Sequence, residues 1–362
     1  MAESRVGSPV PEVIEVRPDE RFDEANLAAY LSGKLEGSER PLEVQQFAGG
    51  HANLTYLLRY GEGEDVIEYV LRRPPLGPVA ASSHDMHREY RVLSKLWRVF
   101  PVAPRAFLYC DDPSVIGADF LVMARRHGVV VRDVIPDQFG GGRDPVANRK
   151  LSEVVIDTLV DFHSIDPSSV GLEGLGKPAG FLERQVTGWA GRFERAKTWE
   201  IEVAEDVNRW LRDNLPESPP PTLVHNDWKL DNMAVAPDDP GRCIAVYDWD
   251  MCTLGDPLCD LGTLLGLWSD PGEGLAGSNP MPTQSVGFLP RAEAAERYCE
   301  RRGIDPATVP YYVVFGTFKM AVVLQQIYFR YHRGQTQDER FAALGKLAEG
   351  LFELASKRRD GC

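Results

Sequence analysis

The sequence predicts an α+β protein in two lobes, a small antiparallel sheet followed by a mainly helical region. Three features carry this prediction. Residues 42–47, 54–60 and 66–72 are short runs of β-forming residues separated by glycine-containing turns, which is typical of an antiparallel meander. Beyond residue 150 the apolar residues recur mostly at helical spacing. The length of 362 residues also exceeds what one hydrophobic core usually organises.

The first lobe is expected to span residues 21–125. It follows residues 1–20, a predicted flexible arm in which three prolines interrupt any periodic pattern. Besides the meander, this lobe is expected to contain helices over residues 21–35 and 84–99 and strands over residues 106–110 and 120–124.

The second lobe is expected to span residues 126–362. Its predicted helices cover residues 151–164, 181–196, 200–214, 293–302 and 311–332. Two short apolar runs interrupt this pattern at residues 222–232 and 243–250, and each ends in a cluster of polar residues. Glycine-rich stretches at residues 140–142 and 272–287 predict loops.

Composition excludes several classes of protein. The formal net charge of −14 argues against a nucleic-acid partner, which would normally meet a basic face. The six cysteines include no CxxC pair, so we expect reduced thiols without a zinc site or a disulfide framework. The N-terminal residues lack the apolar core of a signal peptide, and no apolar run approaches the length that spans a membrane. We therefore expect a cytoplasmic protein without a membrane partner; the sequence does not predict its oligomeric state.

The two short apolar runs deliver a compact set of polar residues. The polar cluster that ends the first run contains Asp227, Lys229 and Asn232, and the cluster that ends the second contains Asp248. If the runs form adjacent strands, these side chains make an oxygen-rich site. Mg²⁺ prefers hard oxygen ligands and takes one or two from the protein beside substrate phosphates and water. Asn232 and Asp248 are therefore the predicted Mg²⁺ ligands.

The same residues suit phosphoryl transfer to a hydroxyl group. This reaction needs the phosphoryl group, the metal and the attacking hydroxyl held in line, and the growing charge neutralised. Asp227 would accept the hydroxyl proton, and Lys229 would direct its ammonium toward the transferring group. These two residues are the predicted catalytic pair.

The spacing His225-x-Asp227-x-Lys229-x-x-Asn232 resembles the catalytic loop of protein kinases, and Asp248 stands where the Asp of the DFG motif would. The segments LVHNDWKLDN, VYDWD and LGDPLCDLG resemble motifs of the aminoglycoside phosphotransferase family, which shares the kinase fold. The segments GGHANLTYLL, YVLRRPP and HDMHREYRVL resemble the branch of that family associated with acyl-CoA dehydrogenases.

The resemblance implies a bilobal protein-kinase-like fold that binds ATP between a small antiparallel-sheet N-lobe and a mainly helical C-lobe. Arg72 would replace the strand-3 lysine and Glu89 would be its ionic partner. The other residues implied for ATP are Gly49, Gly50, Asn53 and Thr55 in the nucleotide loop and Met123, Ala124 and Arg125 in the lobe connector.

The chain departs from the family pattern in places. Its nucleotide loop does not have the GxGxxG pattern. Arg72 offers the planar, forked guanidinium group where lysine would offer a compact ammonium group. Asn226 stands where many aminoglycoside kinases carry glycine. Two further residues near the loop are assigned structural roles. His225 is expected to pack beneath the catalytic segment, and Asp260 to anchor the backbone of this segment from below. Asp250 suits a metal shell and a turn cap equally well.

The acceptor should be a small hydroxylated molecule, because Asp256 follows Asp248 by only eight positions and leaves no room for the activation segment of protein kinases. Resemblance to the named family implies an aminoglycoside. The acyl-CoA-dehydrogenase-linked branch implies a hydroxy acid or a hydroxyacyl thioester. Basic residues and an apolar lining at the mouth of the predicted cleft would favour the hydroxy acid or thioester. Several carboxylates there would favour the aminoglycoside.

Two further interpretations remain open. The chain could be a non-catalytic nucleotide-binding protein with a degenerate kinase fold, although Asp227, Asn232 and Asp248 are all retained. It could also be a metal hydrolase built on His225, Asp227, Asp248 and Asp250, which would show no nucleotide requirement.

Overall fold

The computed structural model describes residues 12–49, 53–76, 85–273, 281–336 and 338–362. The chain divides into two compact units. Unit 1 consists of Met1–Arg126 and Tyr247–Met251, and unit 2 consists of His127–Val246 and Cys252–Cys362. The sequence pattern did not indicate that Tyr247–Met251 returns to the first unit.

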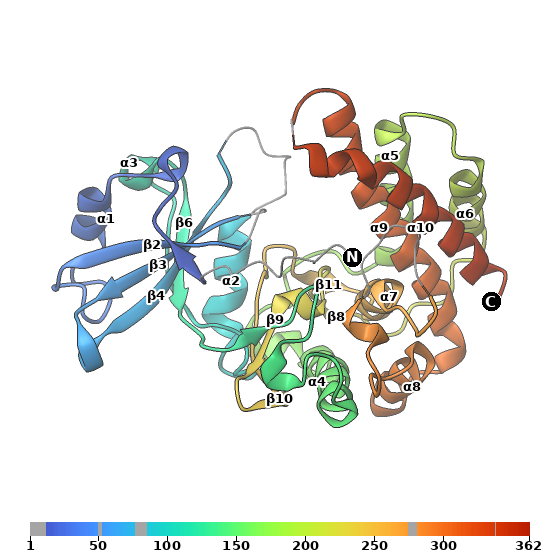
Figure 1. Cartoon of the computed structure of the whole chain (residues 1–362), viewed down its shortest axis with the longest axis horizontal. Coiled ribbons are helices and arrows are strands. Elements are labelled where there is room, and N and C mark those ends of the chain that lie inside the picture. The colour runs from blue at the N-terminus through green and yellow to red at the C-terminus, as the bar shows by residue number, and fades with distance from the viewer. Residues whose placement is uncertain (1–11, 50–52, 77–84, 274–280, 337) are drawn as a thin grey trace, which may run out of the picture. The chain divides into compact units, whose positions relative to one another are not determined.

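Unit 1 is built on a six-stranded sheet with strand order β1-β2-β3-β4-β6-β5 (Figure 1). Each neighbouring pair is antiparallel, so the predicted meander is confirmed as β2, β3 and β4. The strands are β1 (Val13–Ile14), β2 (Leu42–Phe47), β3 (Leu54–Tyr60), β4 (Ile67–Arg73), β5 (Ala106–Cys110) and β6 (Phe120–Ala124). The helices of this unit are α1 (Glu24–Leu31), α2 (Met86–Leu96) and α3 (Pro113–Ile116).

The prediction of a flexible arm is wrong for its second half. Val13 of β1 pairs with Phe47 of β2, which extends the sheet by one short strand. The backbone N–H of Arg17 donates to the side-chain oxygen of Gln46, and Pro18 begins a 3-10 helix. Proline is well suited to that first helical position because its fixed φ is helical and the position needs no N–H donor. Residues 1–11 lie outside the described part of the chain.

Helix α2 places a charged residue on its buried face. Asp85 caps the helix by accepting a hydrogen bond from the backbone N–H of Arg88. Its buried residues recur at helical spacing, as expected for an amphipathic helix, and they are Met86, Glu89, Val92, Leu93 and Leu96. Glu89 is 0% exposed. A carboxylate buried among apolar neighbours needs partners, which are described below.

Unit 2 is mainly helical and contains two small antiparallel sheets (Figure 1). One has the order β10-β9-β7 and the other pairs β11 with β8. Its strands are β7 (Val129–Val130), β8 (Thr222–Val224), β9 (Met233–Ala236), β10 (Asp239–Val246) and β11 (Thr253–Gly255). Its helices are α4 (Pro145–His163), α5 (Phe181–Ala196), α6 (Glu202–Asp213), α7 (Leu258–Leu267), α8 (Arg291–Arg302), α9 (Val309–His332) and α10 (Leu344–Arg359).

Eight short 3-10 helices connect these elements in the described parts of the two units. They cover Pro18–Glu20, Gly63–Asp65, Asp137–Phe139, Pro167–Val170, Leu230–Asn232, Pro282–Gln284, Pro306–Thr308 and Glu339–Ala343.

The two apolar runs of the second lobe are not adjacent strands, as the sequence analysis assumed. Thr222–Val224 (β8) pairs with β11, whereas Asp239–Val246 (β10) pairs with β9. The reason is local: the chain leaves the polar cluster after β8 directly into β9, and a tight turn then returns it as β10. Strands of three or four residues, such as β9 and β11, give too little alternation to be found from sequence.

Helix α9 corrects the statement that no apolar run reaches membrane-spanning length. The helical stretch Pro306–His332 has 27 residues, and its most apolar window has a mean hydropathy of 1.4. Of that window, 67% is buried inside the fold. This burial is typical of the core helix of a globular unit, because a helix that is apolar on all sides must be covered by protein or by lipid.

Helices α7 and α9 cross at a point where glycines bring their backbones into contact. A Cβ atom placed on Gly262 of α7 would lie 2.3 Å from the carbonyl oxygen of Tyr312 of α9. A Cβ atom placed on Gly316 of α9 would lie 2.1 Å from the carbonyl oxygen of Gly262. Only residues without a side chain allow so close an approach, so this crossing fixes the axial position of α9 against α7.

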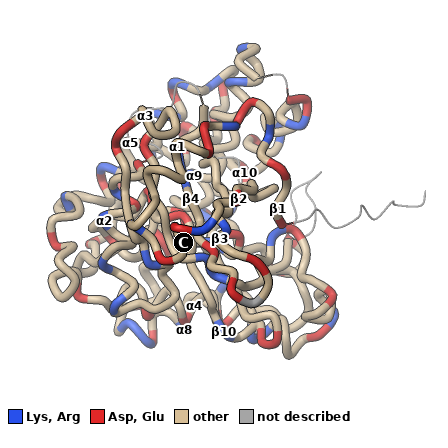
Figure 2. The backbone as a smooth tube through the Cα atoms, turned by 90° about the vertical axis from the view of Figure 1, so that its left-hand side faces the viewer, with Lys and Arg blue, Asp and Glu red and all other residues tan. Residues whose placement is uncertain are grey.

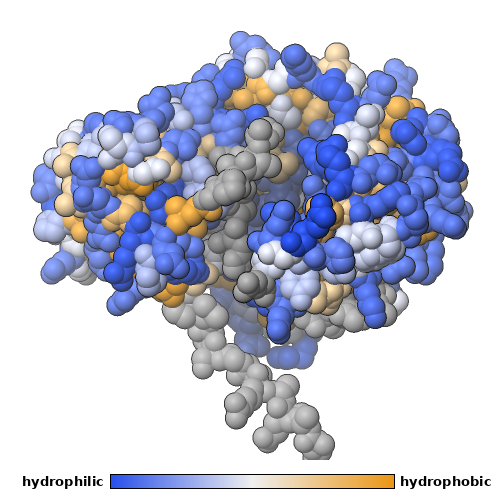
Figure 3. Space-filling model, turned by 90° about the horizontal axis from the view of Figure 1, so that it is seen from above, coloured by the Kyte–Doolittle hydropathy of each residue, from blue (hydrophilic) through white to orange (hydrophobic). Residues whose placement is uncertain are grey.

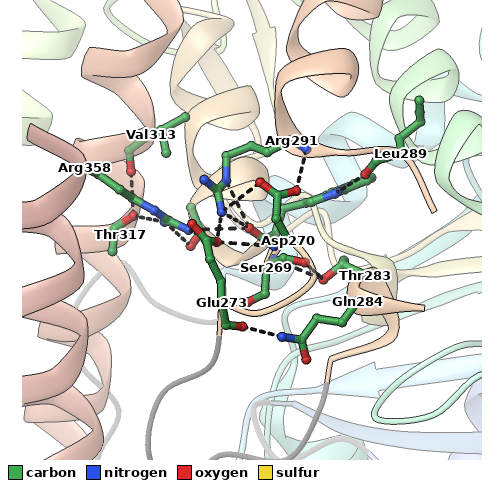
Figure 4. Close-up of polar contacts among 12 residues, drawn as sticks. Ser269, Asp270, Glu273, Thr283, Gln284, Leu289, Arg291, Val313, Thr317 and Arg358 are labelled. Atoms are coloured by element: carbon green, nitrogen blue, oxygen red, sulfur yellow. Dashed lines mark hydrogen bonds and ion pairs between the residues drawn. The ribbon is translucent and has the colours of Figure 1, made fainter. Parts of the chain in front are cut away.

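Helix α10 was not predicted from the sequence, and an arginine cluster ties it to the rest of unit 2 (Figure 4). Arg358 of α10 donates to the carbonyl oxygen of Gly266 at 2.9 Å and to the hydroxyl of Thr317 at 2.5 Å. Arg358 and Arg291 both pair with the carboxylate of Glu273. Burial, with Arg291 nearby, lowers the pKa of Arg358 to about 10.

Charged and apolar residues are dispersed over the chain. Figure 2 shows acidic and basic positions interspersed along the backbone, so the acidic excess is not gathered into one segment in that view. On the face drawn in Figure 3, hydrophilic residues predominate and apolar residues form small groups. Scattered exposed apolar residues are normal on protein surfaces.

The glycine crossing generates a stability prediction. Gly316→Ala should lower the free energy of unfolding by about 2 kcal/mol, because a rigid backbone faces the new methyl group and α9 must shift outward. Urea unfolding followed by far-UV circular dichroism measures this change.

Gly191→Ala is the matched control within a helix. Its Cβ would meet only the end of the Arg195 side chain, at 3.2 Å, so its stability should be unchanged or rise by up to about 1 kcal/mol from helix propensity. Equal stabilities of the two variants would contradict close packing at the crossing.

Candidate active site

The loop that joins β8 to β9 brings three of the predicted residues together. The ammonium of Lys229 lies 2.8 Å from Oδ2 of Asp227. The side-chain amide of Asn232 donates to the same oxygen at 2.8 Å and to the backbone oxygen of Asp227 at 2.9 Å. Asp227 thus has one carboxylate oxygen fixed by two donors.

The other carboxylate oxygen of Asp227, Oδ1, is open to a ligand. No hydrogen bond to Oδ1 is formed by any residue in the described ranges, and the side chain is 28% exposed. A carboxylate that is oriented through one oxygen and open at the other can accept a proton from a bound hydroxyl. This geometry suits the role predicted for Asp227.

A buried carboxylate supports the loop from beneath. Oδ2 of Asp260 accepts the backbone N–H of His225 at 2.6 Å, and Oδ1 accepts the backbone N–H of Asn226 at 2.7 Å. Nε2 of His163 lies 3.2 Å from Oδ2. Burial alone would raise the pKa of Asp260, but the hydrogen bond from His163 and the backbone N–H of His225 hold it below its usual value. The predicted anchoring role of Asp260 is confirmed.

His225 is a structural residue, as predicted. It is 0% exposed and packs edge-to-face on Trp228, with ring centroids 5.6 Å apart. Its Nδ1 accepts the backbone N–H of Asp227 at 3.3 Å. Trp228 is itself buried and donates its indole N–H to the carbonyl oxygen of Val155. The imidazole is therefore committed to holding the loop, which argues against the hydrolase interpretation.

Asn226, beside the predicted base, and Asp248, a predicted metal ligand, adopt left-handed backbone conformations. Asn226 has φ +67° and Asp248 has φ +69°, and they are the two non-glycine residues with positive φ in the described ranges. Strained backbone is concentrated at functional sites in proteins. Glycine and asparagine tolerate this region best, which explains why Asn226 can replace the glycine of the family pattern.

Lys319 of α9 reaches the same loop and was missed in the sequence. Its ammonium donates to the carbonyl oxygen of Asn226 at 2.7 Å and lies 3.5 Å from the hydroxyl of Thr263. The residue is 9% exposed, and burial lowers its pKa although Asp227 and Asp260 act in the opposite direction. The available signal was a single charged residue within the apolar run from residue 311 to 323.

Unit 1 contains the second part of the predicted site. Arg72 at the end of β4 donates through Nη1 to Glu89 of α2 at 2.5 Å and through Nη2 to Asp248 at 2.7 Å. The predicted ionic partnership of Arg72 and Glu89 is confirmed. The backbone N–H of Trp249 also donates to Glu89, at 3.3 Å. The arginine fork therefore bridges two carboxylates, which a lysine could not do with the same geometry.

Burial and charge act in opposite directions on this pair. Burial would lower the pKa of Arg72, but the carboxylates of Glu89 and Asp248 raise it above its ordinary value. Burial raises the pKa of Glu89 to about 8, against the opposing effect of Arg72. Arg72 is thus a permanent cation held at the side chain of Asp248.

The predicted nucleotide-loop residues lie at several places in unit 1. Thr55 of β3 is paired with Arg72 across the sheet. Asn53 is buried and donates to the carboxylate of Asp250 at 3.1 Å, so Asp250 accepts from a side chain of this loop. Gly49 is exposed at the end of β2, and Gly50 lies outside the described residues.

The predicted connector residues follow the end of β6. Met123 is buried and pairs with Val70, and the backbone N–H of Ala124 donates to the carbonyl oxygen of Arg105 at 2.8 Å. Arg125 pairs with Glu12 at 2.5 Å and its guanidinium lies over the ring of Phe47. The side chain of Arg125 is thus engaged within unit 1.

A family model described as the phosphotransferase enzyme family matches residues 43–308. This range covers most of the chain and includes every predicted site residue. The chain belongs to the phosphotransferase enzyme family. The enzyme class predicted from the sequence is thereby confirmed at the level of the family.

Curated relatives add a second association. Acyl-CoA dehydrogenase family member 11 of Gallus gallus is 34% identical over 358 residues, which cover 95% of this chain and 44% of that protein. Acyl-CoA dehydrogenase family member 10 of Mus musculus is 31% identical, over 96% of this chain and 32% of that protein. The chain thus spans less than half the length of these relatives. Both parts of the resemblance found in the sequence are confirmed.

Solved structures confirm the fold class. The crystal structure of a "putative aminoglycoside phosphotransferase" from Ralstonia eutropha superposes with a TM-score of 0.78 at 28% identity, covering 94% of this chain and 99% of that one. Choline kinase from Cryptosporidium parvum superposes with a TM-score of 0.60 at 11% identity, covering 94% and 96% of the two chains, which shows the fold alone. The predicted bilobal kinase-like α+β class is correct.

The anchoring of the loop generates a prediction for Asp260→Asn. An amide has one acceptor oxygen, so its NH₂ group would face one of the two backbone N–H donors. We expect the free energy of unfolding to fall by about 3 kcal/mol, measured by urea unfolding.

Asp161→Asn is the control for Asp260→Asn. Its carboxylate forms a surface pair with Arg301 at 2.9 Å and is 62% exposed, so we expect a loss below about 1 kcal/mol. Equal losses in the two variants would contradict the anchoring role.

Proposed function

We propose that this protein is a Mg²⁺- and ATP-dependent phosphotransferase that moves the γ-phosphoryl group to a hydroxyl of a small molecule. The observation that carries the proposal is the pair of donors, Lys229 and Asn232, that fixes one oxygen of Asp227 and leaves the other open. Membership of the phosphotransferase enzyme family supports it.

In this proposal Asp227 accepts the proton of the acceptor hydroxyl. The hydrogen bond from Asn232 and the ion pair with Lys229 hold the carboxylate in one rotamer, which reduces the cost of positioning it. Lys229 supplies positive charge beside the base. Asp260 and Lys319 bind the backbone around Asn226 and position the loop without taking part in the proton transfer.

Asn232 and Asp248 fit the role of Mg²⁺ ligands by their chemistry. Both hydrogen bonds of the Asn232 side chain use its NH₂ group, so its oxygen is the atom left for a cation. Val246 at the end of β10 pairs with Met233, the residue after Asn232. Asp248 follows Val246 by two residues, and the chain cannot carry it farther than about 7 Å from Val246.

Arg72 fits the binding of nucleotide phosphates. Its buried Nε has no hydrogen-bond partner in the described structure, although both terminal nitrogens are engaged. We propose that Arg72 and Glu89 hold the phosphates together with the nucleotide-loop residues, and that the connector residues hold adenine. The residues so assigned are Gly49, Gly50, Asn53, Thr55, Met123, Ala124 and Arg125. Bound ATP and Mg²⁺ would supply the transferable phosphoryl group and neutralise its charge.

Two acceptor classes remain, and each has one observation in its favour. The structure from Ralstonia eutropha is described as a "putative aminoglycoside phosphotransferase", which favours an aminoglycoside. The curated relatives are described as acyl-CoA dehydrogenase family members, which favours a hydroxy acid or hydroxyacyl thioester. We also propose that the protein acts in the cytoplasm without a nucleic-acid or membrane partner.

Asp227→Asn tests the proposal, because it keeps the shape of the side chain and removes the base. Purified protein is incubated with Mg-ATP and a panel of aminoglycosides, hydroxy acids and hydroxyacyl thioesters, and phosphate addition is read by mass spectrometry. The variant should lower kcat by about 10³-fold and leave the Kd for Mg-ATP, measured by calorimetry, within about threefold.

Asp231→Asn, in the same loop, should keep turnover within about threefold because this exposed carboxylate takes no part in the proposed chemistry. Nucleotide binding without turnover by the unmodified protein on any acceptor would indicate the non-catalytic alternative. Substrate consumption without nucleotide would indicate the hydrolase.

A further inference from the structure

Two basic side chains of unit 2 lie against one buried indole ring. Trp189 of α5 is 8% exposed. The guanidinium carbon of Arg192 lies 4.5 Å from the centroid of its ring, and the ammonium of Lys319 lies 5.7 Å from the same centroid. An aromatic face attracts cations, but two cations at one ring also repel each other. This cation cluster is Trp189, Arg192 and Lys319.

Arg192 has no acidic partner in the described chain. It is half-buried, and burial together with repulsion from Arg195 lowers its pKa. Three other buried or half-buried arginines of the protein do have carboxylate partners: Arg72 binds two carboxylates, and Arg291 and Arg358 share Glu273. A cation removed from water is normally paired, so the partner of Arg192 is expected from outside the chain.

The indole N–H of Trp189 is a second donor without an acceptor. It is buried and forms no hydrogen bond in the described structure. The buried indoles of Trp228 and Trp268 donate to the carbonyl oxygens of Val155 and Leu289, at 3.2 Å and 2.8 Å. Buried donors are almost always paired in proteins, so an orphan N–H beside an unpaired arginine points to a missing acceptor.

A glycine leaves room for the arginine at this place. A Cβ atom placed on Gly188 would lie 3.2 Å from Nη1 of Arg192, which shows that the guanidinium folds back along α5 toward Gly188. Its position is consistent with its stacking on Trp189, three residues earlier in the helix. The three donors therefore share one region of α5 and α9.

We propose that Trp189, Arg192 and Lys319 form a binding site for a small oxyanion, the carboxylate or phosphate group of the acceptor. The indole N–H and the guanidinium supply unpaired donors, and the ammonium of Lys319 retains one of its three donors beyond Asn226 and Thr263. Charge-assisted hydrogen bonds of this kind are the strong ones in proteins.

The site is connected to the reaction centre through Lys319. Its ammonium binds the carbonyl oxygen of Asn226, the residue before Asp227. An acceptor whose anion occupies the cation cluster would therefore be held near the proposed base. That the bound anion belongs to the acceptor rests on the proposed function. The cation cluster would select an anionic hydroxylated acceptor, because a polycation would meet the unpaired positive charges of Arg192 and Lys319.

Indole NMR tests the site without any turnover. The protein has seven tryptophans, and Trp189→Phe assigns the indole N–H signal of Trp189. Titration with sodium acetate, and separately with inorganic phosphate, should move this signal saturably toward lower field, because the N–H gains an acceptor. Sodium chloride at equal ionic strength should not move it. Acetate and phosphate distinguish a carboxylate site from a phosphate site.

Arg192→Gln should weaken the binding of the probe anion at least about tenfold, since a charge-assisted hydrogen bond is lost. Arg195→Gln, an exposed arginine on the same helix, is the matched control; it removes a screened surface charge and no proposed hydrogen bond, so it should change the affinity by less than about threefold. The proposal is overturned if neither anion moves the Trp189 signal, if chloride moves it equally, or if the two arginine variants behave alike.

A second measurement addresses acceptor choice. For any hydroxy acid that the protein phosphorylates, Arg192→Gln should raise KM about tenfold for the acid but leave KM unchanged for its methyl ester and for ATP. Equal effects on acid and ester would refute selection by the cation cluster. Failure of all phosphorylation would instead count against the proposed function, and the NMR titration would remain informative.

Discussion

The loop between β8 and β9 depends on one buried carboxylate, that of Asp260. Its two oxygens accept the consecutive backbone N–H groups of His225 and Asn226, and the ring of His163 lies at hydrogen-bond distance from the oxygen that binds His225. These bonds hold the backbone where Asn226, the residue directly before Asp227, has a left-handed conformation. A turn of this kind is costly by itself, so the surrounding structure must hold it in place.

The helical core adds a second restraint on the same turn. Lys319 binds the carbonyl oxygen of Asn226, so the peptide groups around this residue are held by an anion below and a cation on α9. Lys319 can reach this position only if α9 lies at the correct height along α7. The glycine contact between Gly262 and Gly316 fixes that height. Backbone packing far from the loop in sequence thus helps to position Asp227, the proposed base.

Sequence reasoning found what is local in the chain and missed what is assembled by packing. The spacing from Asp227 to Asn232 sufficed to identify the loop, because the donors Lys229 and Asn232 lie within five residues of Asp227, which accepts from both. The strands of the meander were found because they alternate regularly. Lys319 and the return of Tyr247–Met251 to unit 1 were missed, because their partners lie far away in the chain. The pairing of β8 with β10 was predicted incorrectly because their actual partners, β11 and β9, have only three and four residues and carry no clear strand signal.

The discontinuity of unit 1 has a consequence for how the chain can be divided. Its last five residues, Tyr247–Met251, are synthesised only after about half of unit 2. A fragment ending at residue 126 would lack Trp249, whose ring packs on Phe100 and whose backbone N–H binds Glu89. The nascent amino-terminal region therefore cannot complete its interior during translation until residue 251 has emerged. A chimaera that takes unit 1 from a relative would therefore have to include both Met1–Arg126 and Tyr247–Met251.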